Sequence, residues 1–204
     1  MKSENGIFKT INKIFGPYEF KEKNSKFISL IFPVLESFEA DTILKALKKR
    51  YHDSTHVCFA YRLGNGVEDY FRYSDDGEPS GTAGIPIYSE LKGAGLFNAL
   101  IAVVRYYGGI KLGTGGLVKA YSKSAKNIIN SSTIKTEKIM KRVEIDLPFE
   151  LMGEIMKMVD KYSVTVKDQK FDDKGVKITL DIPETSFAKV RDDIRNVTKG
   201  KINI

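Results

Sequence analysis

Residues 97–129 read FNALIAVVRYYGGIKLGTGGLVKAYSKSAKNII, and the predicted fold is built around them. The apolar, β-branched run from Leu100 to Val104 is too short for a buried helix and predicts a central strand. A glycine-punctuated loop over residues 108–116 follows this strand. A helix is expected from Leu117 onward, because apolar residues then recur at helical spacing. Its buried stripe is expected to be Leu117, Tyr121, Ser124, Ala125 and Ile128.

The order strand, glycine loop, helix suits the binding of an anion. Glycine lets the backbone approach a ligand closely, and a helix start presents free N–H groups and the positive end of the helix dipole. The pattern is neither a Walker loop nor GxGxxG. The alternative is that the glycines only make a tight turn and the lysines only keep the surface soluble. The candidate residues for binding an anion or nucleic acid are Arg105, Lys111, Gly113, Gly115, Gly116, Lys119, Lys123 and Lys126.

The charge around this segment has one sign. No Asp or Glu occurs between Glu90 and Glu137, a window that holds seven Lys or Arg residues. A solvated surface normally mixes both signs, so this window indicates an anionic partner. Residues 1–135 carry 19 Lys or Arg and 13 Asp or Glu, whereas residues 136–204 carry 14 and 13. The first part of the chain therefore holds almost all of the net charge of +7, which favours nucleic acid or an acidic surface there.

A second turn-rich segment, residues 73–82, holds three carboxylates, Asp75, Asp76 and Glu78. They could form a metal–phosphate site or an acid–base pair. They could instead accept hydrogen bonds from neighbouring backbone N–H groups and give the loop its shape. A third possibility is that the acidic loop faces Arg105 and Lys111 and so fixes the glycine loop.

Two further sets of residues lie near this loop in the sequence. A zinc site from His52, Asp53, His56 and Cys58 is disfavoured, because no second Cys or His pair exists in the chain. No metal or cofactor is therefore expected, and no catalytic set is assigned. The motif residues expected near the loop are His56, Arg62, Asp75, Asp76, Glu78, Gly81 and Thr82.

Three blocks of sequence resemble the signature blocks of the IMPACT family. They are YSDDGEPSGTAGIPIY (73–88), VVRYYGGIKLGTGGLVKAY (103–121) and the shorter THVCFAYR (55–62). The resemblance spans roughly residues 18 to 130, and the tail is similar to the small second domain of bacterial members. It implies a fold like the second domain of ribosomal protein S5, followed by a ferredoxin-like domain. It implies a role around translation, since the eukaryotic relatives resemble regulators of a starvation-responsive kinase.

The rest of the chain indicates an α+β protein of two domains, residues 1–134 and 135–204. After residue 138 the apolar pattern predicts strand, helix, strand, strand, helix, with a possible last strand at residues 202–204. This is the order of elements in a ferredoxin-like split βαβ unit. The first domain is expected to be the α/β sandwich that the family resemblance implies.

Composition excludes several classes of protein. The one cysteine, Cys58, excludes an internal disulfide and fits a reducing compartment. The longest apolar runs are far too short to span a membrane. A cytoplasmic location is expected, and the oligomeric state stays open, with a monomer favoured.

Three functions compete. The first is a non-enzymatic protein that binds RNA, the ribosome or a translation-associated protein through the basic glycine-loop and helix surface. The second is a phosphate- or nucleotide-handling enzyme that uses this loop with Asp75, Asp76 and Glu78. The third, a hydrolase, is the weakest, because the chain has one Cys, two His and no Gly-x-Ser-x-Gly motif. The sequence favours the first.

Overall fold

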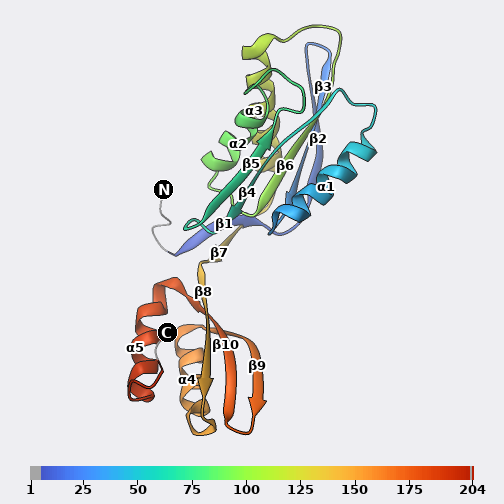
Figure 1. The fold of residues 1–204 in the computed structure, drawn as a ribbon. Helices are drawn as coiled ribbons and strands as arrows, with labels where there is room; N and C mark the ends of the chain where they lie inside the picture. Colours follow the sequence, from blue (N-terminus) through green and yellow to red (C-terminus); the bar gives the residue numbers. More distant parts are fainter. Residues whose placement is uncertain (1–5, 203) are drawn as a thin grey trace. The chain divides into compact units, whose positions relative to one another are not determined.

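The computed structural model describes residues 6–202 and 204. They fall into two compact units, Phe8–Glu137 and Lys138–Ile204, and Gly6 and Ile7 group with the second. Each unit has its own antiparallel sheet and its own buried apolar core. The two-domain α+β fold expected from the sequence is confirmed (Figure 1).

The first unit is built on a five-stranded sheet in the order β2-β3-β6-β4-β5. Strand β6 (Ala99–Tyr106) is the predicted central strand, and all but its last residue is buried. It pairs antiparallel with β3 (Ser25–Pro33) on one side and with β4 (His56–Gly64) on the other. The outer strands are β2 (Phe15–Glu22) and β5 (Asp69–Ser74). A separate pair is formed by β1 (Ile7–Ile11) and β7 (Ile134–Lys138).

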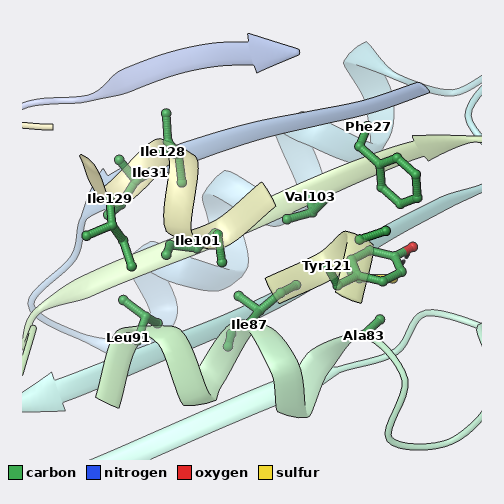
Figure 2. Close-up of a cluster of buried hydrophobic side chains, with 14 of the residues drawn as sticks. Phe27, Ile31, Ala83, Ile87, Leu91, Ile101, Val103, Tyr121, Ile128 and Ile129 are labelled. Atoms are coloured by element: carbon green, nitrogen blue, oxygen red, sulfur yellow. Dashed lines mark hydrogen bonds between the residues drawn. The ribbon is translucent and has the colours of Figure 1, made fainter. Parts of the chain in front are cut away.

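Helices cover both faces of this sheet (Figure 1). Helix α1 (Ser37–Arg50) packs on one face with Ala40, Leu44 and Leu47. Helices α2 (Gly84–Gly93) and α3 (Gly113–Ser131) pack side by side on the other. Alternate residues of each strand feed the two cores, as the period of a strand requires. Figure 2 shows the α2–α3 core, in which Tyr121 of α3 lies beside Phe27 of β3 and Ala83.

Helix α3 spans Gly113–Ser131, so the prediction that the helix begins at Leu117 was wrong by four residues. The loop after β6 ends at Leu112, and Gly115 and Gly116 lie in the first turn of the helix. A Cβ at Gly116 would lie 3.1 Å from Cβ of Leu112. Leu112 is buried beneath this turn, and no side chain caps the start of the helix. The expected buried stripe, from Leu117 to Ile128, is confirmed.

The second unit has a three-stranded sheet in the order β8-β10-β9. Strands β8 (Met140–Leu147) and β9 (Thr165–Asp172) flank β10 (Gly175–Pro183), and both pairs are antiparallel. The core of this unit is formed with α4 (Met152–Tyr162) and α5 (Phe187–Val197). Short 3-10 turns, Phe149–Leu151 and Glu184–Ser186, precede the two helices.

The insertion of β10 between β8 and β9 is the ferredoxin-like split βαβ arrangement. The possible last strand includes residue 203, which lies outside the described residues. Within the part of the chain that the structure describes, no helix is long and apolar enough to cross a membrane.

Candidate anion-binding site

A buried ion pair joins the acidic loop to the central strand. Arg105 is near the end of β6 and is only 5% exposed, and Glu78 is only 8% exposed. The guanidinium donates from Nη1 to Oε1 of Glu78 at 2.6 Å and from Nη2 to Oγ of Ser25 at 3.2 Å. The expectation that the acidic loop faces Arg105 thus agrees with the geometry. It also means that Arg105 is engaged inside the protein rather than free at its surface.

Tyr121 and Cys58 complete this buried network. The Tyr121 hydroxyl donates to Oε1 of Glu78 at 2.7 Å, and the Cys58 thiol lies 3.3 Å from that hydroxyl. Burial raises the pKa of the Tyr121 hydroxyl and the pKa of the Cys58 thiol. Both groups therefore favour their neutral forms and act as hydrogen-bonding groups in this network. His56 lies at the edge, with Nε2 3.9 Å from Oε2 of Glu78.

Asp75 organises the acidic loop from within. Its carboxylate accepts N–H bonds from Gly81, Ala83 and Gly84 at 2.8 to 2.9 Å. Burial opposes its ionisation, but the three backbone N–H groups outweigh burial and lower the pKa of Asp75. Gly81 has φ of +75°, which only glycine adopts at little cost. The side chain of Thr82 donates to the carbonyl of Pro79, which closes the turn.

Asp76 ties the same loop to β4 and α1. It accepts the backbone N–H of Val57 at 2.7 Å, and its other oxygen pairs with Lys48. His56 Nδ1 lies 2.8 Å from the Asp76 carbonyl. All three carboxylates of the loop are therefore engaged by protein groups. Among the described residues, no group of three or more His, Cys, Asp or Glu side chains could hold a metal ion.

A pocket of about 420 Å³ opens between the acidic loop, the end of β6 and the start of α3. Lys111 and Tyr107 line it from the glycine loop, and both are exposed. The first turn of α3 contributes Gly113 and Thr114. The wall opposite is formed by Glu78 and Arg105. The pocket thus combines a surface cation, a helix N-terminus and a buried ion pair.

The other predicted basic residues lie along α3. Lys119, Lys123 and Lys126 are exposed, and they share one helix face because they are spaced at i, i+4 and i+7. We call these three residues the basic stripe. The ammonium of Lys123 lies 5.0 Å from the centre of the Phe20 ring of β2. Neither the basic stripe nor Lys111 pairs with a carboxylate in the described part of the chain.

Basic residues of the second unit are arranged differently. Eight of them lie within 4.0 Å of a carboxylate: Lys141, Arg142, Lys157, Lys161, Lys167, Lys170, Lys177 and Arg191. On its open sheet face, Arg142 pairs with Asp181 and Lys177 with Glu144, so the charges there offset one another.

The structure separates Arg62 from the other motif residues. Arg62 lies six residues along β4 from His56, which corresponds to about 20 Å in a strand. It donates to both carboxylate oxygens of Asp69 at 2.8 Å and stacks on Phe97. Its role is to join β4 to β5, away from the pocket.

Sequence reasoning missed several residues of this region. Ser25 and Tyr121 were not expected to reach the Arg105–Glu78 pair, and Tyr107 and Thr114 were not assigned to the pocket. Gly108 was also overlooked: a Cβ there would lie 2.1 Å from the backbone of Asn24, so only glycine lets the loop cross the β2–β3 turn. The one available signal was the block 103–121, which places Arg105, Tyr107 and Thr114 in one short segment.

Sequence comparisons place the two units in known domain families. The profile of the Impact N-terminal domain matches residues 23–129. A domain family of unknown function, DUF1949, matches residues 145–201. The IMPACT family member YvyE of Bacillus subtilis is 31% identical over 189 residues, which cover 93% of this chain and 86% of that protein. An IMPACT family member of Haemophilus influenzae is 30% identical over 190 residues, covering 92% of this chain and 91% of that protein.

Comparison with solved structures agrees on the fold. A crystal structure described only as that of a hypothetical protein superposes with a TM-score of 0.72. It is 24% identical in sequence, and the match covers 96% of this chain and 95% of that one. This likeness extends over both units and supports the two-domain fold alone.

Proposed function

Because this chain belongs to the IMPACT family, we propose that it is a non-enzymatic binding protein that acts in translation or its regulation. We propose that it contacts RNA, on the ribosome or free, through the basic stripe on α3. The link to translation comes from the resemblance of the signature blocks. The choice of RNA rests on the charges of the first unit.

The observation that carries the proposal is the unpaired state of the basic stripe. Lys119, Lys123 and Lys126 are exposed and have no carboxylate partner among the described residues. In the second unit, eight of the fourteen Lys and Arg residues of 136–204 are paired within their own unit. An unpaired cation can neutralise a phosphate without first breaking an internal ion pair. Because three such cations lie together on one face of α3, the basic stripe is suited to a phosphate backbone.

The size of the stripe limits the affinity. Three to four lysines, counting Lys111, would neutralise three to four phosphates of a single strand. The logarithm of the binding constant should then fall against the logarithm of salt concentration with a slope of about −2 to −3. Phosphate contacts carry no sequence information, so a weak sequence preference is expected.

The test is binding of the full chain to single-stranded RNA across a salt series. The variant Lys119→Glu with Lys123→Glu should bind more weakly and show a shallower salt slope, because two phosphate contacts are lost. A matched control is Lys174→Glu with Lys189→Glu, which changes the net charge equally at exposed positions of the second unit. If both double variants lose the same affinity, only the net charge matters and the stripe is not the contact.

A protein partner is the other outcome to separate. A pull-down from cell lysate, with and without ribonuclease, distinguishes the two directly. Capture of ribosomal components that ribonuclease abolishes would support the RNA contact. Capture that survives ribonuclease and is lost in the Lys119→Glu, Lys123→Glu variant would assign the stripe to an acidic protein instead.

A further inference from the structure

We infer that the pocket at the start of α3 binds a phosphate monoester, from either a free nucleotide or the 5′ end of an RNA chain. This inference goes beyond the proposed RNA contact, because it concerns Lys111, the first turn of α3 and Arg105 rather than the basic stripe. Phosphate binding in this pocket does not depend on RNA binding by the basic stripe.

The start of α3 is left without an internal anion. The helix has 19 residues, no acidic residue in its first turn and no side chain that caps it. The N–H groups of Gly113, Thr114 and Gly115 donate to no side chain or loop carbonyl in the described part of the chain. Free N–H groups at a helix start and the positive end of the dipole together favour a phosphate group.

Charged side chains around the pocket point to the same ligand. Lys111 lines the pocket and has no carboxylate partner among the described residues. The opposing carboxylate of Glu78 is already neutralised by Arg105 at 2.6 Å. Arg105, buried in the pocket wall, keeps its Nε–H without an acceptor in the described part of the chain. A buried donor without a partner is unusual, and the net charge left at the pocket is positive.

Gly115 gives an independent reason to expect a ligand. Its φ is not positive, and a Cβ there would meet nothing within 4 Å. Glycine is less favourable than alanine in a helix, and neither backbone conformation nor packing explains it here. A bare backbone at the helix start is what the close approach of a phosphate requires.

Tyr107 suggests how a nucleotide could fit. The residue lines the pocket and is 45% exposed, and its backbone N–H donates to Oγ1 of Thr55 at 2.9 Å. The guanidinium of Arg105 lies 5.5 Å from the ring centre. An anchored, exposed aromatic ring next to a phosphate site can stack on a base. The pocket volume is within the range usual for small-molecule sites.

The test is a titration of the ¹⁵N-labelled full chain, followed by amide chemical shifts, with inorganic phosphate, adenosine 5′-monophosphate and adenosine. We expect saturable shifts of the Gly113, Thr114 and Gly115 amides with both phosphates and none with adenosine. Lys111→Glu should weaken binding about tenfold or more, since a hydrogen-bonded charge contact is lost. The matched control is Lys45→Glu, an exposed position of α1 on the opposite face of the sheet, which should leave the affinity unchanged.

A second pair of variants guards against misfolding of Lys111→Glu. Thr114→Glu places a carboxylate at the open helix start and should abolish phosphate binding, whereas Thr114→Gln, of nearly the same size, should retain it. The inference is overturned if these amides show no saturable shift with phosphate or the nucleotide. It is also overturned if adenosine acts like its monophosphate, or if Lys111→Glu and Lys45→Glu weaken binding equally.

Two further arms identify the source of the phosphate. An oligoribonucleotide carrying a 5′-phosphate is compared with the same sequence ending in a 5′-hydroxyl. Tighter binding of the phosphorylated form that disappears in Lys111→Glu assigns the pocket to an RNA end. Equal binding of the two oligonucleotides, with saturable binding of the mononucleotide, assigns it to a free nucleotide.

Discussion

The acidic loop offers a sharp test, because its two adjacent aspartates have unequal roles. Asp75 accepts three backbone N–H groups, whereas Asp76 accepts one and pairs with Lys48. We therefore expect Asp75→Asn to destabilise the first unit clearly more than Asp76→Asn. Both changes remove one negative charge and keep the side-chain size, so each variant controls for the other.

The expected magnitudes follow from these bonds. In Asp75→Asn one oxygen can still accept from Ala83 and Gly84, but the new amide group would face the N–H of Gly81. The N–H of Gly81 then loses its acceptor, and the two remaining hydrogen bonds go to a neutral oxygen instead of a charged one. Together these losses should lower the free energy of unfolding by about 2 to 4 kcal/mol. In Asp76→Asn the oxygen can still accept from Val57, and only an ion pair to a half-exposed lysine is lost, worth at most about 1 kcal/mol.

The pH dependence provides a second readout. The pKa of Asp75 is lowered in the folded protein. Its ionised carboxylate is therefore more stable in the folded protein than in the unfolded chain. Its stabilising contribution is present at neutral pH and is lost as the pH falls below about 4. The difference in stability between the natural protein and Asp75→Asn should therefore shrink below that pH.

Urea unfolding of the full chain, followed by far-ultraviolet circular dichroism, gives the free energies. Hydrogen exchange of the Gly81, Ala83 and Gly84 amides assigns the loss to the first unit. The reasoning is refuted if Asp76→Asn costs as much as Asp75→Asn. It is refuted equally if the difference between the natural protein and Asp75→Asn persists unchanged below pH 4.

Two further predictions concern the thiol and the junction between the units. Because Cys58 is fully buried and burial raises its pKa, a disulfide reagent should leave the native thiol unmodified and label it fully in denaturant. Fast labelling of the native protein would contradict this. The domain boundary after residue 134 remains a prediction: trypsin should cut first after Lys135 or Lys138, in the exposed strand β7, and release two resistant fragments. Earlier cleavage within either sheet would count against two independent domains.

The sequence predicted those features that depend on nearby residues. The apolar run of β6 and the stripe of α3 follow from local periodicity. The structural role of Asp75 is also local, since its partners lie six to nine residues away. These parts of the fold and of the site could therefore be assigned with no knowledge of long-range pairing.

The errors arose where the answer depends on register or on packing. Arg62 was grouped with His56 because the two share a sequence block. In a strand, however, successive residues are about 3.3 Å apart, so the two side chains lie far from each other. The start of α3 was placed too late because glycine usually marks a loop. The contact of Arg105 with Ser25 joins residues 80 positions apart, and no local pattern specifies it.

The strand order of the first unit also constrains how the sheet can assemble. Strand β6 lies between β3 and β4, although it follows both in the chain, so two hairpins, β2–β3 and β4–β5, must stay unjoined until residues 99–106 are available. Pairing of Phe27 with Arg105 closes a loop of nearly 80 residues, which makes folding slow relative to proteins with local contacts. A nascent chain that stops before β6 would expose two hairpins with open apolar edges, and such edges are prone to aggregation.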